Sequence, residues 1–308
     1  MNEIDKTTKK LVGVELSGSM LKGVCLSKDG APIDSAKILL DREQEVSSQL
    51  TGFINELRSK FGDFQKVGIA MPGLLNRLTN RVALSTHFPE HTDIDLADEI
   101  KNKTGLEAIL ENDANAAAYG EYTLGAGRGS RDMFYLTLGA GVGGAFIFDG
   151  RLWRGASGFA GELGYIKINS EGMTLEEVAS AESIIRRIKN RVHQDSTSSL
   201  AKINEEDVSV SDVVSAANKG DDFAKMMLER TGTFVGTAVA NVINLLNIER
   251  IVVGGEIMQA ENFVLDAISK RAKEISFEPS FETTQIVAGE LGDSAMAVGA
   301  ALLSAKEI

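Results

Sequence analysis

Two stretches of the chain follow the same plan, and this internal repeat constrains the fold more than any other feature. Residues 11–30 contain an apolar strand, a turn of small residues, a returning strand and an Asp-Gly turn. Residues 133–150 repeat this order about 120 residues later. Apolar runs bounded by glycine and small polar residues are typical of β-hairpins. The repeat therefore predicts two related halves, each beginning with a hairpin.

The segments after each hairpin alternate between helix-like and strand-like patterns. Helices are expected at residues 47–60, 96–104, 113–122, 175–192, 213–219, 222–246, 263–273 and 294–304, and strands at 66–70, 107–110, 250–253 and 284–288. Strands that alternate with helices after a hairpin start predict an α/β fold with mixed sheets. Two such sheets are expected to face each other across a cleft.

Composition narrows the class of protein. The chain has 308 residues, of which 43% are hydrophobic and 25% charged, so it can form one large or two ordinary globular domains. Its formal net charge of −12 argues against a nucleic-acid partner and against an anionic membrane surface. Backbone amides and Mg²⁺ can still supply local positive charge for a nucleotide.

Cysteine usage and hydropathy predict a cytoplasmic protein. Cys25 is the one cysteine of the sequence, which excludes an internal disulfide bond and a cysteine-rich metal site. Residues 1–10 are polar and lack the apolar core of a signal peptide. No uninterrupted apolar run reaches the length needed to span a membrane.

The polar run 111–115 joins an apolar strand to a predicted helix. Asp113 in this run is either the N-cap of the helix or a general base that deprotonates a sugar hydroxyl attacking a γ-phosphate. Both roles are compatible, because a capping position fixes the carboxylate. Asn112 can hydrogen-bond the same substrate or serve as a turn residue.

Glycine-rich turns suggest phosphate binding. The turn at 139–144 lacks the Lys-Ser or Lys-Thr ending of a P-loop, and no long helix follows directly as in a dinucleotide fingerprint. A hairpin whose amides point at phosphate fits better, and the matching turn at 17–19 is a second indication of phosphate binding. Gly254 and Gly255 form a third turn, which allows either a close approach to an adenosine or a left-handed backbone before a helix.

Two glutamates and the three histidines are further candidate site residues. Glu162 lies among glycines that can aim its carboxylate inward, although a solvated loop position is the alternative. Glu176 begins a helix and can simply favour the helix dipole. His87, His91 and His193 show no metal-ligand spacing. A base, phosphate turns and polar substrate contacts together predict phosphoryl transfer to a hydroxyl.

Four motifs then carry a resemblance to a known family. They are Glu-Asn-Asp-Ala-Asn-Ala-Ala-Ala (111–118), Leu-Thr-Leu-Gly-x-Gly-Val-Gly-Gly (136–144), Arg-Gly-Ala-x-Gly-x-Ala-Gly-Glu-Leu-Gly (154–164) and Ile-Val-Val-Gly-Gly (251–255). In this order, and ending with Leu-Gly-Asp-Ser-Ala (291–295), they resemble the ROK family of sugar kinases and sugar-responsive repressors. Motifs of this length are specific for a family and less so for its activity.

The resemblance implies an actin-like, ribonuclease H-like fold of two lobes. The small lobe is expected to comprise residues 1–112 with the C-terminal helix 294–308, and the large lobe residues 113–293. ATP and sugar would meet in the interlobe cleft. A homodimer in the cytoplasm is the corresponding expectation for assembly and location.

The family's functional positions can be carried over one by one. Asp113 matches the catalytic base, and the sugar-binding positions match Gly73, Asn112, Glu162 and Glu176. Tyr165 either places its hydroxyl near the sugar or simply packs. The phosphate-binding segments match Ser17, Gly18 and Ser19 and also Gly139, Ala140 and Gly141, and the adenosine segment matches Gly254 and Gly255. Glu15 would act on Mg²⁺ through water.

The chain departs from the family pattern at several positions. Glu15 stands where Asp is usual, Ser17 where Gly is usual, Ala140 where Thr is usual, and Tyr165 where His is usual. Residues 166–174 contain neither Cys nor His, so no zinc site is expected. Ten polar residues before the first strand leave no room for the helix-turn-helix of the repressors. The first hypothesis is therefore an ATP- and Mg²⁺-dependent, glucokinase-like sugar kinase, and the second a sugar-binding sensor with little or no kinase activity.

Overall fold

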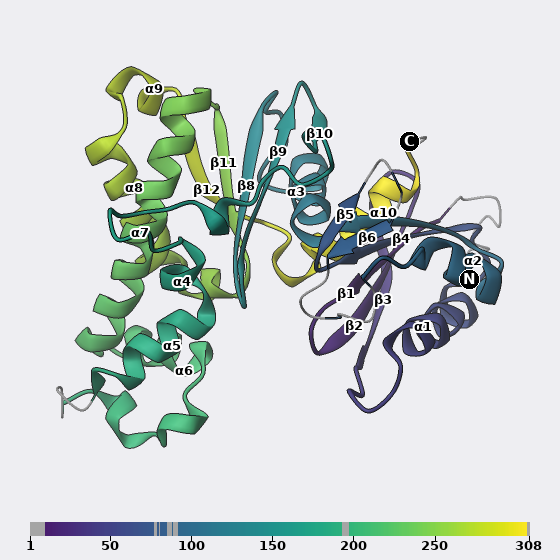
Figure 1. Ribbon diagram of the computed structural model, residues 1–308, viewed down its shortest axis with the longest axis horizontal. Coiled ribbons are helices and arrows are strands. Elements are labelled where there is room, and N and C mark those ends of the chain that lie inside the picture. Colours follow the sequence, from purple (N-terminus) through teal and green to yellow (C-terminus); the bar gives the residue numbers. More distant parts are fainter. Residues whose placement is uncertain are drawn as a thin grey trace, which may run out of the picture. The chain divides into compact units, whose positions relative to one another are not determined.

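The computed structural model describes residues 10–76, 79, 81–84, 88, 92–192 and 197–306 (Figure 1). His87, His91 and His193 lie outside the described residues. The chain forms two compact units. Unit 1 contains residues 1–128, 152–160 and 293–308, and unit 2 contains residues 129–151 and 161–292. Each unit carries a sheet with helices against it, which confirms the predicted α/β fold.

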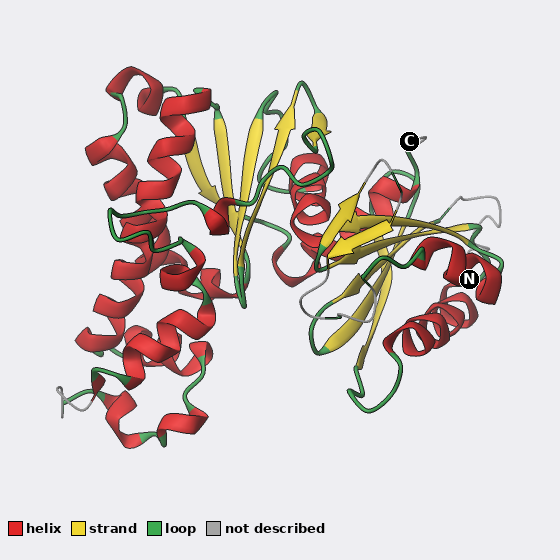
Figure 2. Cartoon of the chain, in the orientation of Figure 1, coloured by secondary structure: helices red, strands yellow, loops and turns green. Residues whose placement is uncertain are grey.

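Unit 1 is built on a five-stranded sheet with the order β3-β2-β1-β4-β7. Figure 2 draws strands in yellow and helices in red. The strands are β1 (Leu11–Leu16), β2 (Met20–Leu26), β3 (Pro32–Leu39), β4 (Lys66–Met71) and β7 (Glu107–Asn112). Strands β1, β2 and β3 pair antiparallel, whereas β4 pairs parallel with both β1 and β7. The ends of β4 and β7 therefore lie at the same edge of the sheet. A small hairpin of β5 (Leu74–Asn76) and β6 (Arg81–Leu84) follows β4.

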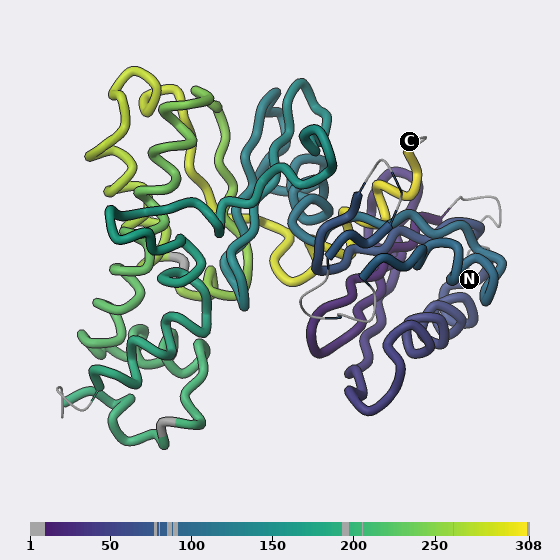
Figure 3. Tube along the Cα trace, viewed as in Figure 1, coloured from purple at the N-terminus to yellow at the C-terminus, as the bar shows by residue number. Residues whose placement is uncertain are grey.

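Four α-helices are described in unit 1: α1 (Val46–Phe61), α2 (Leu96–Thr104), α3 (Asp113–Leu124) and α10 (Ala295–Ser304). The C-terminal α10 returns beside the N-terminal strands, as the yellow and purple segments of Figure 3 show. It lies directly on the sheet, because a Cβ atom on Gly68 would be only 1.8 Å from the carbonyl oxygen of Ala300. This close packing fixes the residues that precede α10 near the ends of the strands.

Unit 2 repeats the arrangement with the order β10-β9-β8-β11-β12. Its strands are β8 (Met133–Leu138), β9 (Val142–Phe148), β10 (Arg151–Trp153), β11 (Arg250–Gly254) and β12 (Gln285–Ala288). The β8–β9 hairpin is antiparallel, and β11 pairs parallel with β8 and β12. The sequence repeat at 11–30 and 133–150 thus corresponds to the same hairpin in both sheets.

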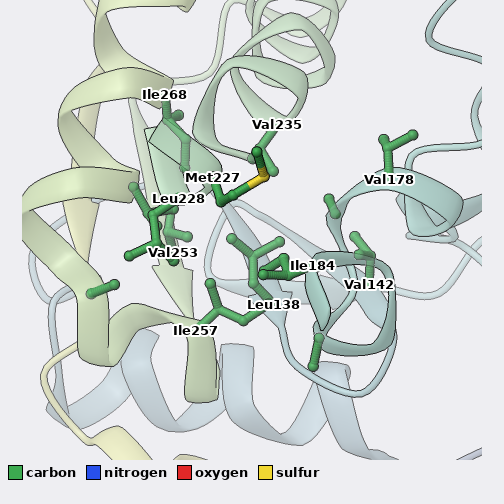
Figure 4. Close-up of a cluster of buried hydrophobic side chains, with 14 of the residues drawn as sticks. Leu138, Val142, Val178, Ile184, Met227, Leu228, Val235, Val253, Ile257 and Ile268 are labelled. Carbon is green, nitrogen blue, oxygen red and sulfur yellow. The ribbon is translucent and has the colours of Figure 1, made fainter. Parts of the chain in front are cut away.

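The described helices of unit 2 are α4 (Glu176–Ala179), α5 (Ala181–Lys189), α6 (Val210–Asn218), α7 (Asp222–Leu246), α8 (Glu261–Ile275) and α9 (Glu278–Glu282). Side chains of the sheet and helices form one buried cluster, in which Leu138, Ile184, Met227 and Val253 pack together (Figure 4). Burying the apolar surface of such a side chain contributes about 1.5–3 kcal/mol. Of the helices that the structure describes, none combines the length and apolarity required to cross a bilayer.

The prediction of one helix over residues 175–192 is wrong. Two helices, α4 and α5, occupy this segment, because Ser180 has an extended backbone with ψ of 160°. Its side chain accepts a hydrogen bond from the amide of Ser183 and so caps α5. The apolar periodicity continues across the break, which explains why the sequence suggested one continuous helix.

Candidate active site

Asp113 is the first residue of α3, directly after β7. The N-cap of this helix is Asn112, whose Oδ1 accepts a hydrogen bond from the amide of Asn115 at 3.1 Å. The interpretation of Asp113 as the N-cap is therefore wrong, because the neighbouring residue has the extended backbone that a cap requires. The half-buried Asp113 carboxylate accepts a hydrogen bond from the amide of Ala114 at 2.8 Å. It lies at the positive end of the helix dipole, which favours its charged form.

Asn112 also reaches the loop that follows β4. Its Nδ2 donates a hydrogen bond to the carbonyl oxygen of Gly73 at 3.1 Å. Strands β4 and β7 are neighbours, with Met71 opposite Asn112, so both loops begin at the same edge of the sheet. The structure therefore brings Gly73, Asn112 and Asp113 together, as the carboxyl ends of adjacent parallel strands require.

A buried ion pair supports this junction. Glu111 is 3% exposed as a residue. Its carboxylate accepts hydrogen bonds from Nε and Nη2 of Arg154 at 3.0 and 2.6 Å. Its other oxygen accepts hydrogen bonds from the Asn112 amide and the Asn115 side chain, each at 3.1 Å. This pair was not predicted from the sequence. Both residues belong to the quoted motifs, but 43 positions separate them and no spacing rule connects them.

Glu15 on β1 is a second carboxylate at this end of unit 1. Burial raises its pKa to about 7, and the charges of Asp113 and Asp293 act in the same direction, against the opposing charge of Lys22. Its Oε2 atom is buried and has no hydrogen-bond partner. Lys22 lies opposite Glu15 in the β1–β2 register and donates to the carbonyl oxygen of Asp293 at 2.7 Å. Neither Lys22 nor Asp293 was singled out from the sequence.

The first predicted phosphate turn closes the β1–β2 hairpin. The Ser17 amide donates to the Met20 carbonyl at 3.0 Å, and the Ser17 hydroxyl lies 3.2 Å from both the carbonyl and the amide of Met20. Arg42 donates to the carbonyl oxygen of Gly18. Among the hydrogen bonds described for this turn, none uses the amides of Gly18 or Ser19 as donors. Two adjacent amides of this kind can bind an anion.

The second predicted phosphate turn closes the β8–β9 hairpin of unit 2. The Gly139 amide donates to the Gly141 carbonyl at 3.0 Å, and the Gly139 carbonyl accepts from the amide of Ala181 at 2.8 Å. Glu176 holds the other side, because its Oε2 accepts from the Val142 amide at 2.9 Å. In the described part of this turn, the amides of Ala140 and Gly141 donate no hydrogen bond that is recorded. Glu176, expected to contact the sugar, thus holds the Gly139 turn through this hydrogen bond.

The predicted adenosine segment lies beside this turn. Gly255 follows β11 with φ of 95°, and a Cβ atom there would be 2.3 Å from the carbonyl oxygen of Leu138, the last residue before the turn. Glycine is therefore required at Gly255 by both its backbone conformation and its close packing. Within unit 2, the structure brings Gly254 and Gly255 next to the segment 139–141.

Glu162 is the N-cap residue of a short 3-10 helix, η2 (Leu163–Tyr165), and Tyr165 is its last residue. The loop before η2 packs against β9, because a Cβ atom on Gly161 would lie 2.1 Å from the Gly144 carbonyl oxygen. The Glu162 side chain is exposed, and Tyr165 is 67% exposed. Tyr165 therefore does not pack into the core of unit 2, which was one of the two expectations for it.

The donor set of unit 1 fits Mg²⁺ bound through water better than direct coordination. Mg²⁺ prefers oxygen ligands and commonly keeps several waters beside one or two carboxylates and the substrate phosphates. The buried, unpartnered Oε2 of Glu15 supplies one such acceptor. Among the described residues, no three His, Cys, Asp or Glu side chains converge to hold a metal ion.

The two sheets, their matching hairpins and the turns at their ends define an actin-like α/β protein. A model of the ROK family matches residues 11–307. The chain belongs to the ROK family.

Named relatives include kinases and a regulator. The glucokinase of Thermotoga maritima is 30% identical over 97% of this chain and 98% of its own length. A ROK family glucokinase from Streptomyces griseus, solved in complex with glucose and AMPPNP, is 27% identical with a TM-score of 0.84, covering 96% of this chain and 99% of that chain. A ROK family transcriptional regulator, a homologue of the E. coli MLC protein, is 26% identical with a TM-score of 0.87 and covers 98% of this chain and 79% of that chain.

Proposed function

We propose that the chain is an ATP-dependent sugar kinase that transfers the γ-phosphate to a hydroxyl of a hexose or of an N-acetylated or amino hexose. The observation that carries this proposal is the half-buried Asp113 carboxylate, held at the start of α3 beside its capping neighbour Asn112. The glucokinases among the relatives, one solved with glucose and AMPPNP, support the same activity.

In this proposal Asp113 accepts the proton of the attacking sugar hydroxyl, which makes the oxygen a better nucleophile. Asn112 and the loop at Gly73 orient the sugar from unit 1. Glu162, Tyr165 and Glu176 provide further sugar contacts. A carboxylate held by a backbone amide acts without losing much conformational freedom, so proton transfer from a bound hydroxyl costs little reorganisation.

The glycine turns hold the nucleotide. Amides of Gly18 and Ser19 and of Ala140 and Gly141 contact phosphate oxygens, and Gly254 and Gly255 admit the adenosine. Ser17 and Gly139 shape these turns through the hydrogen bonds described above. Mg²⁺, when bound with ATP, neutralises charge on the phosphoryl group, and Glu15 would position its water.

We further propose that the chain works as two lobes, residues 1–112 with 294–308 and residues 113–293, which close on the substrates and exclude water. The compact units differ from these lobes in residues 113–128, which include α3, in the segment 152–160 and in residue 293, all of which belong to unit 1. A homodimer in the cytoplasm is proposed on family likeness, and light scattering after size-exclusion chromatography tests the dimer.

A sugar-binding sensor is the second candidate function. Glu15, Ser17 and Ala140 depart from the usual kinase pattern, and one relative is a transcriptional regulator. A coupled assay of ADP release over a panel of hexoses, N-acetylhexosamines and amino hexoses separates the two. Sugar-dependent ADP production supports the kinase. Sugar binding by calorimetry without any ADP production contradicts the kinase and supports the sensor.

A further inference from the structure

Four arginines gather at the end of α5 in unit 2, although the whole chain has a net charge of −12. Arg186 and Arg187 lie in the last turns of α5, Arg191 follows it, and Arg230 comes from α7. The guanidinium carbons of Arg187 and Arg230 each lie 5.7 Å from the centroid of the Phe234 ring. One aromatic ring therefore holds two cations side by side, which fixes the directions of their donors.

Arg187 is the most buried of the four. It donates to the carbonyl oxygen of Val178 and, at 2.5 Å, to the hydroxyl of Thr231. Its Nε atom is buried and has no hydrogen-bond partner. A buried donor without an acceptor is costly, and a buried guanidinium is normally paired with an anion. Burial, then the charges of Arg230, Arg186 and Arg191, lower its pKa to about 10.

Among the described residues, Arg186 has the Glu177 carboxylate near it, whereas the other three arginines of this cluster form no ion pair. The ion pairs described in unit 2 use Arg131, Lys225 and Arg271 as their cations. Within the described part of the chain, no carboxylate forms an ion pair with Arg187, Arg191 or Arg230. Like charges held together in this way raise the affinity of the surface for an anion.

We propose that Arg187, Arg191 and Arg230, arranged around Phe234, form a binding site for a phosphate group, carried either by free phosphate or by a phosphorylated sugar. A phosphate dianion supplies the acceptor oxygens and the charge that the cluster lacks. The planar fork of a guanidinium matches phosphate oxygens in pairs, which a compact ammonium group does not. This site uses residues of α5 and α7 and none of the residues assigned to ATP or sugar.

The site is linked to the second glycine turn through α4 and α5. Arg187 holds the carbonyl of Val178 at the end of α4. At the start of the same helix, Glu176 accepts from the Val142 amide at 2.9 Å. The first residue of α5, Ala181, donates to the carbonyl of Gly139 at 2.8 Å. An anion that draws Arg187 away from Val178 therefore acts on a helix that holds the turn.

The test follows the Nε–H group of Arg187 by 15N nuclear magnetic resonance in the full chain. Inorganic phosphate and glucose 6-phosphate are titrated separately, with chloride balancing the ionic strength. A saturable shift with at least one of them is expected, because this donor gains an acceptor. The absence of a saturable shift with both overturns the proposal. Equal affinity for the two anions identifies a site for the phosphate group alone, whereas tighter binding of glucose 6-phosphate identifies a phosphomonoester site.

Variants of single arginines test whether the phosphate-induced shift comes from the proposed site. Arg230→Gln and Arg191→Gln each remove one charged donor at an exposed position and should weaken binding about ten-fold. Arg151→Gln removes an exposed arginine elsewhere in unit 2 and should leave the dissociation constant unchanged. Equal affinity in all three variants contradicts the site. The proposed link requires the Val142 amide to shift with the same dissociation constant, and an unchanged Val142 resonance overturns the link.

Discussion

The two hairpins of the protein share one backbone plan but carry different chemistry at matching positions. Glu15 lies two residues before the turn in β1, and Thr137 holds the same place in β8. Their cross-strand neighbours are Lys22 in unit 1 and Gly143 in unit 2. A charged pair thus stands in one hairpin where a hydroxyl and a glycine stand in the other.

The two turns are also held in different ways. Each turn has a bond of its own, from Ser17 to Met20 or from Gly139 to Gly141. The side chain that contacts the first turn from outside is the cation of Arg42, whereas the second turn is contacted by the carboxylate of Glu176. In each turn two successive amides, those of Gly18 and Ser19 or of Ala140 and Gly141, remain without a described acceptor. The two turns thus repeat one backbone geometry, whereas the ionisable residues Glu15 and Lys22 of the unit 1 hairpin have a hydroxyl and a glycine as their counterparts in unit 2.

The largest expected effect on stability comes from breaking the buried pair of unit 1. Arg154→Gln removes the cation that binds Glu111, a carboxylate whose side chain is 4% exposed. Removing one partner of a buried pair costs about 3 kcal/mol or more. Urea unfolding followed by circular dichroism should show this loss.

A surface pair of the same unit provides the control. Arg58→Gln breaks the contact with Asp63. The Arg58 side chain is 43% exposed and the Asp63 side chain 92% exposed. Exposed pairs contribute about 0–1 kcal/mol, so this variant should remain close to the wild type. Similar losses for the two variants would show that the Glu111 pair is no more important than a surface pair.

The buried Glu15 should make the stability of unit 1 depend on pH. Its folded pKa of about 7 lies above the ordinary 4.5, so its contribution is fully present below pH 4.5 and is lost as pH rises through 7. Glu15→Gln cannot ionise and keeps this stability. The free energy of unfolding of the variant, relative to that of the wild type, should therefore increase by about 2–3 kcal/mol as the pH rises from 5 to 8.

Urea unfolding followed by circular dichroism at each pH can follow this change, because unit 1 contains both strands and helices. The exposed Glu43→Gln is the matched control, and its free-energy difference from the wild type should stay flat over the same range. A flat difference for Glu15→Gln as well would show that the Glu15 carboxylate is hydrated in solution.

The turn of unit 2 can be made more polar. Ala140→Thr adds a hydroxyl at an exposed position of the turn. One further hydrogen bond to a charged phosphate, made in the transition state, should raise kcat/KM for ATP about ten-fold. Ala140→Val has the same shape without the hydroxyl and should give no increase. If valine raises the rate as much as threonine, a shape effect replaces the hydrogen-bond explanation.

The smallest effect is expected at Ser17. Its hydroxyl already bonds to Met20 within the turn, so Ser17→Ala should lower the free energy of unfolding by about 1 kcal/mol. Phosphoryl transfer should change less than ten-fold, because the amides of the turn remain. A hundred-fold loss of kcat would place the hydroxyl on the phosphate.

Local sequence patterns predicted the parts of the fold that repeat. The paired hairpins, the parallel strands that follow them and the long α7 correspond to apolar runs with clear turns. Strand β3 was not predicted, since its side chains are mostly exposed and its pairing with β2 comes from the sheet. The break at Ser180 was missed because the capping bond depends on a backbone conformation that periodicity does not report.

The candidate site could be predicted where its residues are neighbours in sequence. Asn112 and Asp113 were found together, but the capping role was considered for Asp113, whereas Asn112 is the N-cap. Two contacts depend on the folded arrangement of distant segments and could not be predicted from residue spacing. They are Glu111 with Arg154 and Lys22 with Asp293. The arginines 187 and 230 escaped notice for the same reason.

The proposed kinase activity depends most directly on the Asp113 carboxylate as the base of phosphoryl transfer. Asp113→Asn keeps an oxygen that can accept from the Ala114 amide, so the fold should be preserved. We predict that sugar-dependent ADP release falls about 100-fold or more while calorimetry shows the sugar still bound, and that the exposed Asp98→Asn retains full activity. An Asp113→Asn variant that releases ADP at the wild-type rate would contradict the account.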